Sequence, residues 1–151
     1  MVKTIYTQDL FKGKTALITG GGTGIGLRTA MELSQLGATV ILASRKKENI
    51  ESGVKKIEDA GGKAFAVECN IRGEESVEKC IAQSLDRAGS IDLLINNAGG
   101  QFPSPAEAIS QKGWNAVIET NLTGTFLMSK EVFKKYFKEN GGSIVNVIAN
   151  M

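Results

Sequence analysis

The chain has 151 residues, a length typical of one domain that is large enough to bury a hydrophobic core. It is 42% hydrophobic and 23% charged with 2 prolines, a composition that excludes disorder as the dominant state. The net charge of +2, with lysines and arginines scattered, indicates no nucleic-acid partner. No apolar run reaches membrane-spanning length and the first residues lack a signal-peptide core, so we predict no membrane partner and a cytoplasmic location.

Two absences narrow the chemistry further. The sequence contains no histidine, which excludes any catalytic triad that depends on one. Its two cysteines, Cys69 and Cys80, provide neither a disulfide framework nor a metal site. The 18 glycines exceed the roughly 11 that average usage predicts for this length.

Short apolar runs alternate with helical stripes along the chain. The runs predict strands, and the stripes, ended mostly by glycines, predict helices. This alternation indicates βαβ units around a buried parallel sheet. We predict an α/β fold, a Rossmann-like doubly wound parallel sheet with five strands in the order 3-2-1-4-5 and helices on both faces. The predicted strands span 15–19, 38–43, 64–67, 91–95 and 143–148, and the predicted helices 25–36, 46–60, 74–88 and about 113–139.

A glycine-rich loop follows the first predicted strand and opens the first helix. Its spacing is G-x-x-x-G-x-G rather than G-x-G-x-x-G. Glycines allow a tight turn and let backbone N–H groups approach a pyrophosphate, and the helix N-terminus adds partial positive charge. A flexible turn without a ligand is the alternative, but a strand before and a helix after the loop favour dinucleotide binding. The residues expected to bind are Gly20, Gly22, Thr23, Gly24, Ile25 and Gly26.

The residues after the second predicted strand indicate which dinucleotide binds. Ser44, Arg45 and Lys46 stand there, and no acidic residue occurs before Glu48. An acid at this place would hold the ribose 2′-hydroxyl of NAD, whereas a hydroxyl group and cations accept a 2′-phosphate. The sequence therefore favours NADP(H) over NAD(H). The alternative, cations at the start of a solvated helix, fits poorly because positive charge is unfavourable there.

Three motifs resemble the short-chain dehydrogenase/reductase family and together cover almost the whole chain. They are Thr-Gly-x-x-x-Gly-x-Gly at 19–26, Asn-Asn-Ala-Gly at 96–99, and Asn121 inside the long predicted helix. The stretches 69–72, 99–107 and 113–126 are similar to its peroxisomal trans-2-enoyl-CoA reductase and 2,4-dienoyl-CoA reductase branch, which uses NADPH.

The resemblance implies roles for further residues. Asn121 would be catalytic, bending its helix and holding a water that relays protons; without the family it would be interpreted as a satisfied buried amide. The family more often has Asp at the first adenine-flanking position. The positions implied to contact the cofactor are Asn70 and Ile71 beside the adenine, and Asn97, Ala98 and Gly99 on the nicotinamide side.

The catalytic Tyr-x-x-x-Lys of the family has no match, because neither Tyr6 nor Tyr136 is followed by Lys four positions later. The resemblance places that motif after the fifth strand, so we expect residues 1–151 to be a single dinucleotide-binding domain, the N-terminal part of a longer subunit without a complete active site. The family's catalytic serine aligns with Ala149. Loss of that hydroxyl weakens ketone reduction and favours reduction of a C=C bond.

Three functions follow as alternatives. The first is NADPH-dependent reduction of a 2-enoyl- or dienoyl-CoA, so that the small-molecule partner is an acyl thioester. The second is a 3-oxoacyl or other carbonyl or alcohol oxidoreductase of the same family, and the third is a nucleotide-binding fragment without catalysis. Apolar residues wrap more than one face of the long helix, which indicates core packing. The resemblance implies that this helix also pairs subunits in a homo-oligomer, a dimer or tetramer.

Overall fold

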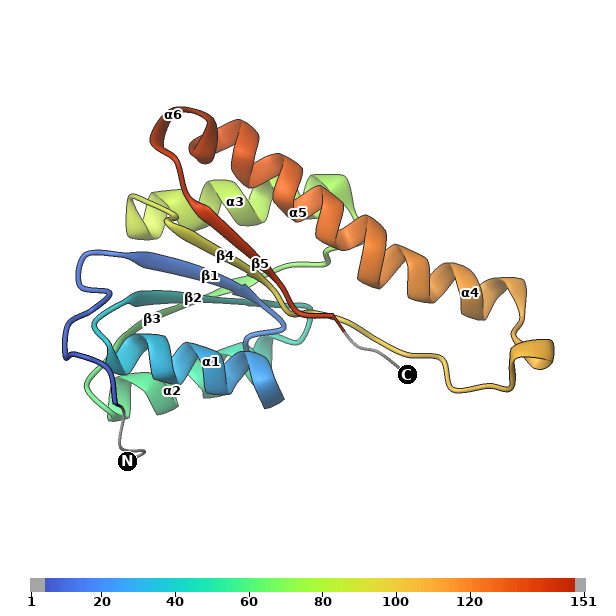
Figure 1. Cartoon of the computed structure of the whole chain (residues 1–151), viewed down its shortest axis with the longest axis horizontal. Helices are drawn as coiled ribbons and strands as arrows, with labels where there is room; N and C mark the ends of the chain where they lie inside the picture. Colours follow the sequence, from blue (N-terminus) through green and yellow to red (C-terminus); the bar gives the residue numbers. More distant parts are fainter. Residues whose placement is uncertain (1–4, 149–151) are drawn as a thin grey trace.

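A computed structural model describes residues 5–148 and confirms the predicted α/β fold (Figure 1). All strand pairs are parallel, and the order is β3-β2-β1-β4-β5. The chain first builds outward from β1 to β3 and then returns to the other side of β1. The order of the sheet therefore reverses between β1 and β4, the position where doubly wound folds bind ligands. The strands are β1 (Thr15–Thr19), β2 (Thr39–Ser44), β3 (Lys63–Glu68), β4 (Leu93–Asn96) and β5 (Ser143–Asn146).

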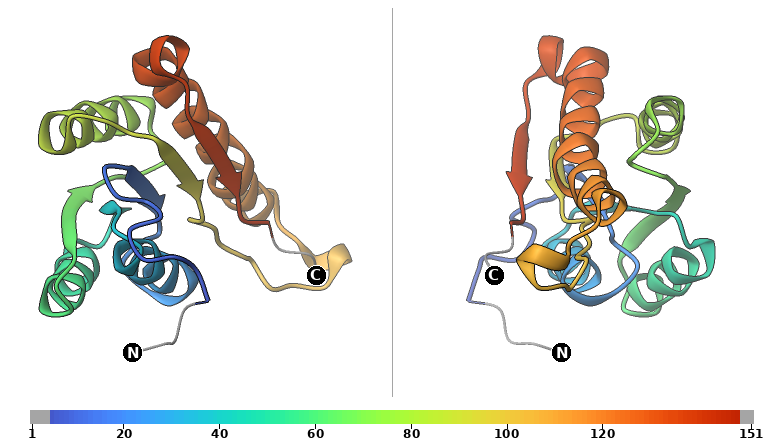
Figure 2. Two further views of the ribbon diagram at one scale, coloured as in Figure 1. Left: turned by 60° about the vertical axis from the view of Figure 1, so that its left-hand side comes forward. Right: turned by 90° about the vertical axis from the view of Figure 1, so that its right-hand side faces the viewer.

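Helices cover both faces of the sheet, as predicted. The helices α1 (Gly24–Gln35) and α2 (Lys47–Asp59) lie on one face, and α3 (Glu74–Ala88) and α5 (Gly124–Val132) lie on the other (Figures 1 and 2). Successive strand residues point to opposite faces, so each face has its own buried cluster. Ile18 belongs to the cluster under α1 and α2, whereas its neighbour Leu17 belongs to the cluster under α3 and α5.

The long predicted helix exists, but it is not regular. It comprises α4 (Gln111–Ile118), the π turn η2 (Glu119–Thr123), α5, the π turn η3 (Phe133–Phe137) and α6 (Lys138–Asn140). A prediction from apolar spacing does not separate a π turn from an α turn, because both keep the chain helical. The helix is capped at Ser110, whose hydroxyl oxygen accepts the Gly113 N–H at 3.1 Å.

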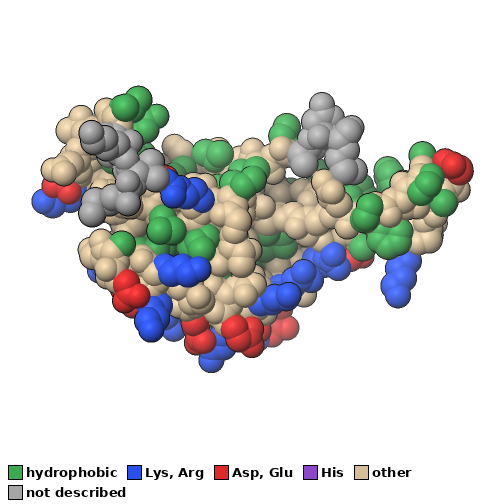
Figure 3. Space-filling model, turned by 90° about the horizontal axis from the view of Figure 1, so that it is seen from below, with side chains coloured by type: hydrophobic (Ala, Val, Ile, Leu, Met, Phe, Trp, Pro, Cys, Tyr) green, Lys and Arg blue, Asp and Glu red, His purple; other side chains and the backbone are tan. Residues whose placement is uncertain are grey.

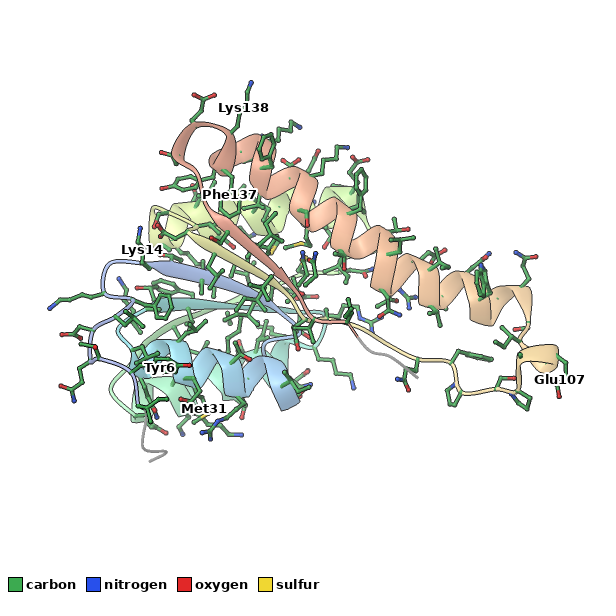
Figure 4. The ribbon with its side chains drawn as sticks, viewed as in Figure 1. Tyr6, Lys14, Met31, Glu107, Phe137 and Lys138 are labelled. Atoms are coloured by element: carbon green, nitrogen blue, oxygen red, sulfur yellow. The ribbon has the colours of Figure 1, made fainter. Side chains whose placement is uncertain are left out.

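The segment between β4 and α4 extends away from the sheet. It holds the short 3₁₀ helix η1 (Ala106–Ala108), and Figure 4 shows Glu107 at its tip, far from the body of the fold. Hydrophobic side chains gather over this end in the space-filling view, whereas acidic and basic side chains are interspersed under the body (Figure 3). Within the described residues, no helix has the length and hydropathy needed to cross a membrane.

Element ends differ from the predicted ones by one or two residues, for example at β4, which begins at Leu93 rather than 91, and at β5. This strand ends at Asn146 rather than 148, and all its residues are exposed. Ala149, the position aligned with the family's serine, lies outside the described residues.

Asp92 joins the strands at their amino-terminal ends, opposite the edge where a ligand is expected. Its carboxylate accepts hydrogen bonds from Lys14 Nζ at 2.8 Å, the Thr15 N–H at 2.9 Å and Ser90 Oγ at 3.3 Å. Burial opposes its ionisation, but these hydrogen bonds hold the pKa of Asp92 below its usual value. The charged form of Asp92 thus ties β1 to β4.

Candidate functional site

A cavity of about 350 Å³ lies at the carboxyl edge of the sheet, where the segments after β1, β2, β3 and β4 converge. This is the crevice that the strand order predicts. Residues from positions 20 to 120 line it, so distant parts of the sequence meet here. They are Gly20, Thr23, Gly24, Ile25, Ala43, Ser44, Arg45, Cys69, Asn70, Ile71, Arg72, Asn97, Ala98, Gly99 and Thr120.

The glycine loop needs its glycines for two separate reasons. Gly20 and Gly24 have φ angles of +64° and +53°, in the left-handed region that side chains rarely adopt. Gly26 has no room for a side chain, because a Cβ there would collide with the Gly20 carbonyl oxygen. Gly22 packs against Asn49 of α2, and a Cβ on it would lie 2.8 Å from the Asn49 carbonyl carbon. Gly22 and Gly26 thus shape the loop without lining the cavity.

The ends of β1 and β4 are tied together by Thr19 and Asn97. The Thr19 hydroxyl oxygen accepts the N–H groups of Asn97 and Ala98, each at 3.0 Å. In return, Asn97 Nδ2 donates to the Thr19 carbonyl at 3.0 Å. These bonds fix the Asn97–Gly99 segment at the crevice on the side opposite β2. Thr19 has a bracing role that the sequence did not assign, although it begins the glycine motif.

The end of β2 places positive charge at the cavity. Ser44 and Arg45 line it, and the Lys46 N–H donates to Ser44 Oγ at 3.4 Å. Lys46 is the exposed residue just before α2 and does not line the cavity. Among residues 5–148, neither Arg45 nor Lys46 forms an ion pair. Arg45 therefore brings a positive charge without an ion-pair partner to this end of the cavity, although Glu68, which stands opposite Ser44 on β3, lines a second pocket together with Arg45.

The turn after β3 closes the third side of the cavity. The Asn70 N–H donates to Ser76 Oγ at 2.9 Å, and Asn70 Oδ1 accepts the Arg72 N–H at 3.3 Å. Ile71 is buried against Gly124. Cys69 also lines the cavity, and a hydrogen bond with Cys80 lowers the pKa of its thiol. Both cysteines are buried and free.

Asn121 lies in the π turn η2 and does not line the cavity. Its Nδ2 donates to the Gly100 carbonyl at 2.7 Å and to the Val117 carbonyl at 3.1 Å. Its Oδ1 accepts the Gly100 N–H at 3.0 Å. The side chain is therefore exposed, with both of its N–H donors and one acceptor site of its oxygen in use, and it holds the segment after β4 against the irregular part of the helix.

The sequence and structure comparisons agree on the family. A family model described as short chain dehydrogenase matches residues 14–151. The chain belongs to the short chain dehydrogenase family. This confirms the resemblance found in the motifs of the glycine loop and of residues 96–99.

Curated relatives of this short chain dehydrogenase include peroxisomal 2,4-dienoyl-CoA reductases. The Danio rerio enzyme is 38% identical over 148 residues, which cover 97% of this chain and 49% of the relative. The Rattus norvegicus enzyme is 35% identical over the same share of this chain and 51% of its own length. The chain thus spans about half the length of these relatives.

Solved structures of short chain dehydrogenases superpose closely. The citronellol catabolism dehydrogenase AtuB of Pseudomonas aeruginosa has a TM-score of 0.94 and 47% identity, covering 98% of this chain and 61% of that chain. An actinorhodin polyketide ketoreductase solved with NADPH has a TM-score of 0.85 and 36% identity, covering 88% of this chain and 52% of that chain.

The predicted cytoplasmic location of this short chain dehydrogenase is contradicted by the comparison. The curated relatives named above are peroxisomal enzymes. The prediction rested on composition and on the first residues, and neither carries information about a peroxisomal destination.

Four residues line the cavity of this short chain dehydrogenase without having been assigned to it: Ala43, Cys69, Arg72 and Thr120. Ala43 and Cys69 adjoin predicted residues, so their positions at the ends of strands were a usable signal. Arg72 and Thr120 are 48 residues apart and hydrogen-bond to each other. No sequence pattern links them, because their contact depends on how the long helix crosses the sheet.

Proposed function

We propose that residues 1–151 form a dinucleotide-binding domain that takes NADP(H) and serves the reduction of a C=C bond in a 2-enoyl- or dienoyl-CoA. The observation that carries the cofactor assignment is the positive charge at the end of β2, where Arg45 stands beside Ser44 and forms no ion pair among residues 5–148. A 2′-phosphate supplies the missing negative charge, whereas the 2′-hydroxyl of NAD does not.

The shape of the site fits a dinucleotide. The backbone of Gly20 lies close against Gly26 in the first turn of α1, so the space that a Cβ on Gly26 would need is already filled. Such a glycine-lined helix start accepts a pyrophosphate through backbone N–H groups. Asn70 and Ile71 would contact the adenine. The bound nicotinamide supplies the hydride, and the segment Asn97–Gly99 would position it.

The substrate assignment is supported by the relatives. The two curated relatives described above are reductases of dienoyl-CoA thioesters. AtuB is a dehydrogenase of citronellol catabolism and is 47% identical to this chain, which favours alcohol or carbonyl chemistry as the second candidate. Asn121 would hold a proton-relaying water in either reaction, through the acceptor site that its Oδ1 keeps beside the Gly100 N–H.

The cofactor proposal is tested by titrating NADPH and NADH into the protein and into Arg45→Ala. We expect the variant to lose about tenfold or more in NADPH affinity, because a charge-assisted contact to phosphate is removed, and NADH binding to stay within about twofold. Arg87→Ala is the matched control, since Arg87 is an exposed residue at the end of α3 and the change in net charge is the same. Equal losses for both cofactors in Arg45→Ala would refute the 2′-phosphate role.

The substrate proposal is tested on the complete subunit that contains this domain, by following NADPH consumption with a trans-2-enoyl-CoA and with a 3-oxoacyl-CoA, and NADP⁺ reduction with an allylic primary alcohol. Faster turnover of the enoyl thioester supports the proposal. Faster turnover of either other substrate makes the second candidate the function. NADPH binding without turnover of any of the three supports a nucleotide-binding role without catalysis.

A further inference from the structure

Arg72 makes an unusual contact across the cavity. The Nε–Nη2 edge of its guanidinium faces the long helix, with Nε donating to Thr120 Oγ1 at 2.6 Å and Nη2 donating to the Ala116 carbonyl at 3.1 Å. Among residues 5–148, Arg72 forms no ion pair. Both Arg72 and Thr120 line the cavity. The guanidinium thus hydrogen-bonds to the helix and not to a carboxylate of the described residues.

Side-chain donors supplement the backbone hydrogen bonds in the last turn of α4, next to η2. A π turn interrupts the regular i→i+4 ladder, and the carbonyls just before it accept side-chain donors in addition to backbone N–H groups such as that of Glu119, which donates to the Ala116 carbonyl. Thr120 Oγ1 itself donates to the Ala116 carbonyl at 2.8 Å, and Asn121 Nδ2 donates to the Val117 carbonyl. Arg72 adds a second side-chain donor to the Ala116 carbonyl and donates to the buried Thr120 hydroxyl oxygen.

We propose that Arg72 is a positioning residue that locks η2 in the register presenting Asn121 to Gly100. The turn after β3 and the segment after β4, 97–100, are thereby joined through the helix. The two segments are far apart in the sequence and are linked by two sets of hydrogen bonds. Arg72 bonds to Thr120, and Asn121, the next residue in the helix, bonds to Gly100. The two sides of the cavity would then close on a ligand as one unit. The effect on ligand binding rests on the proposed dinucleotide function. The contact between Arg72 and the helix is independent of that function.

The planar fork of arginine is required, because two acceptors are met from one edge. A lysine keeps the charge and offers a single point of contact. Arg72→Lys therefore keeps the electrostatic attraction for an anionic ligand and removes the two-point contact with the helix, so a defect in this variant reports the positioning role. On the helix side, Thr120→Val removes the acceptor with little change in shape, whereas Thr120→Ser retains it.

The first experiment measures amide hydrogen exchange of Gly100 by NMR in the ligand-free chain. We expect exchange to accelerate about tenfold or more in Arg72→Lys and Thr120→Val, because Gly100 loses its ordered acceptor on Asn121, and to remain at the original rate in Thr120→Ser. The Gly20 N–H, which donates to the Ala43 carbonyl at 2.7 Å, is the internal reference and should not change. Unchanged Gly100 exchange in both Arg72→Lys and Thr120→Val would overturn the proposal. If one variant does not fold, the other decides.

The second experiment compares NADPH with adenosine 2′,5′-bisphosphate, which lacks the nicotinamide half. If Arg72 positions segment 97–100, Arg72→Lys should weaken the binding of NADPH by about tenfold and the binding of the adenosine bisphosphate by less than about twofold. Equal weakening of both probes would mean that Arg72 acts only locally, and would overturn the coupling. If the unaltered chain binds neither probe, the proposed function fails, while the exchange measurement still decides whether Arg72 locks the turn.

Discussion

Gly26→Ala tests the close approach between α1 and the glycine loop. The added methyl group would collide with the Gly20 carbonyl oxygen and would lie 2.5 Å from Asn97 Nδ2, about 0.9 Å short of the 3.4 Å at which ordinary van der Waals contact begins. Neither neighbour yields easily. The Gly20 N–H is held by the Ala43 carbonyl at 2.7 Å, and Asn97 Nδ2 is held by the Thr19 carbonyl at 3.0 Å.

Two opposing contributions set the size of the effect. Alanine is favoured over glycine in a helix interior by about 1 kcal/mol. Overpacking against fixed atoms costs about 3 kcal/mol, the upper end of its usual range. We therefore expect Gly26→Ala to lower the free energy of unfolding by about 2 kcal/mol. Displacement of the Gly20 carbonyl would also distort the cavity, so NADPH affinity should fall by about tenfold or more.

Urea denaturation followed by circular dichroism measures the stability, and fluorescence titration measures NADPH binding. Gly100→Ala is the control, because a Cβ on Gly100 meets nothing within 4 Å and its φ is not positive. That variant should unfold within about 0.5 kcal/mol of the original chain. If Gly26→Ala were as stable as Gly100→Ala and bound NADPH as tightly as the original chain, the packing of α1 on the loop described above would be wrong.

Two further predictions concern stability away from the cavity. Because the folded pKa of Asp92 lies below its ordinary value of 3.8, its bonds to Lys14 and Thr15 stabilise the fold above that pH and are lost as pH falls through the lower folded pKa. Asp92→Asn should thus unfold more easily than the original chain at neutral pH, with the difference shrinking below about pH 4 in urea titrations; a constant difference contradicts this. Phe137→Ala removes a buried ring packed on Gly142 and should cost about 3–5 kcal/mol in the same assay, so a loss under about 1 kcal/mol contradicts that packing.

Much of the fold was predictable because its elements obey simple periodicities. Continuous apolar runs such as Thr15–Thr19 become buried parallel strands, and the glycine loop falls between β1 and α1 as expected. The same logic predicts that residues at strand ends share one edge, and Arg45, Asn70 and Asn97 do line one cavity. These inferences need only the chain order of the elements.

The rest of the site depends on contacts that no local pattern encodes. Gly26 belongs to the predicted phosphate loop but packs against Gly20 instead of lining the cavity, and the direction in which a glycine backbone faces cannot be taken from its spacing. Lys46 follows Arg45 in sequence, yet the start of α2 turns it outward. Arg72 reaches Thr120 only because the helix crosses the sheet at that point.

The π turns bring onto one side of the long helix buried residues that a regular α-helix would spread over a wider arc. Thr120, Gly124, Met128 and Val132 are buried at intervals of four. In an α-helix, twelve residues at 100° each would carry the last about 120° away from the first, and one extra residue in a turn absorbs about 100° of that drift. The turn η2 thus keeps Thr120 at the cavity while the residues after it face the core.

The second π turn works in the same way. Val132 and Phe137 are both buried although they are five residues apart, a separation that an α-helix would place about 140° apart. Because η3 spans residues 133–137, the two side chains come onto the same side of the helix and both reach the core between α3 and the sheet. The π turn near Asn121, η2, therefore works together with the second π turn, η3. One turn places polar groups at the cavity, and the other restores the contact of the helix end with the core, so that the polar register at Thr120 is held by packing at both ends of α5.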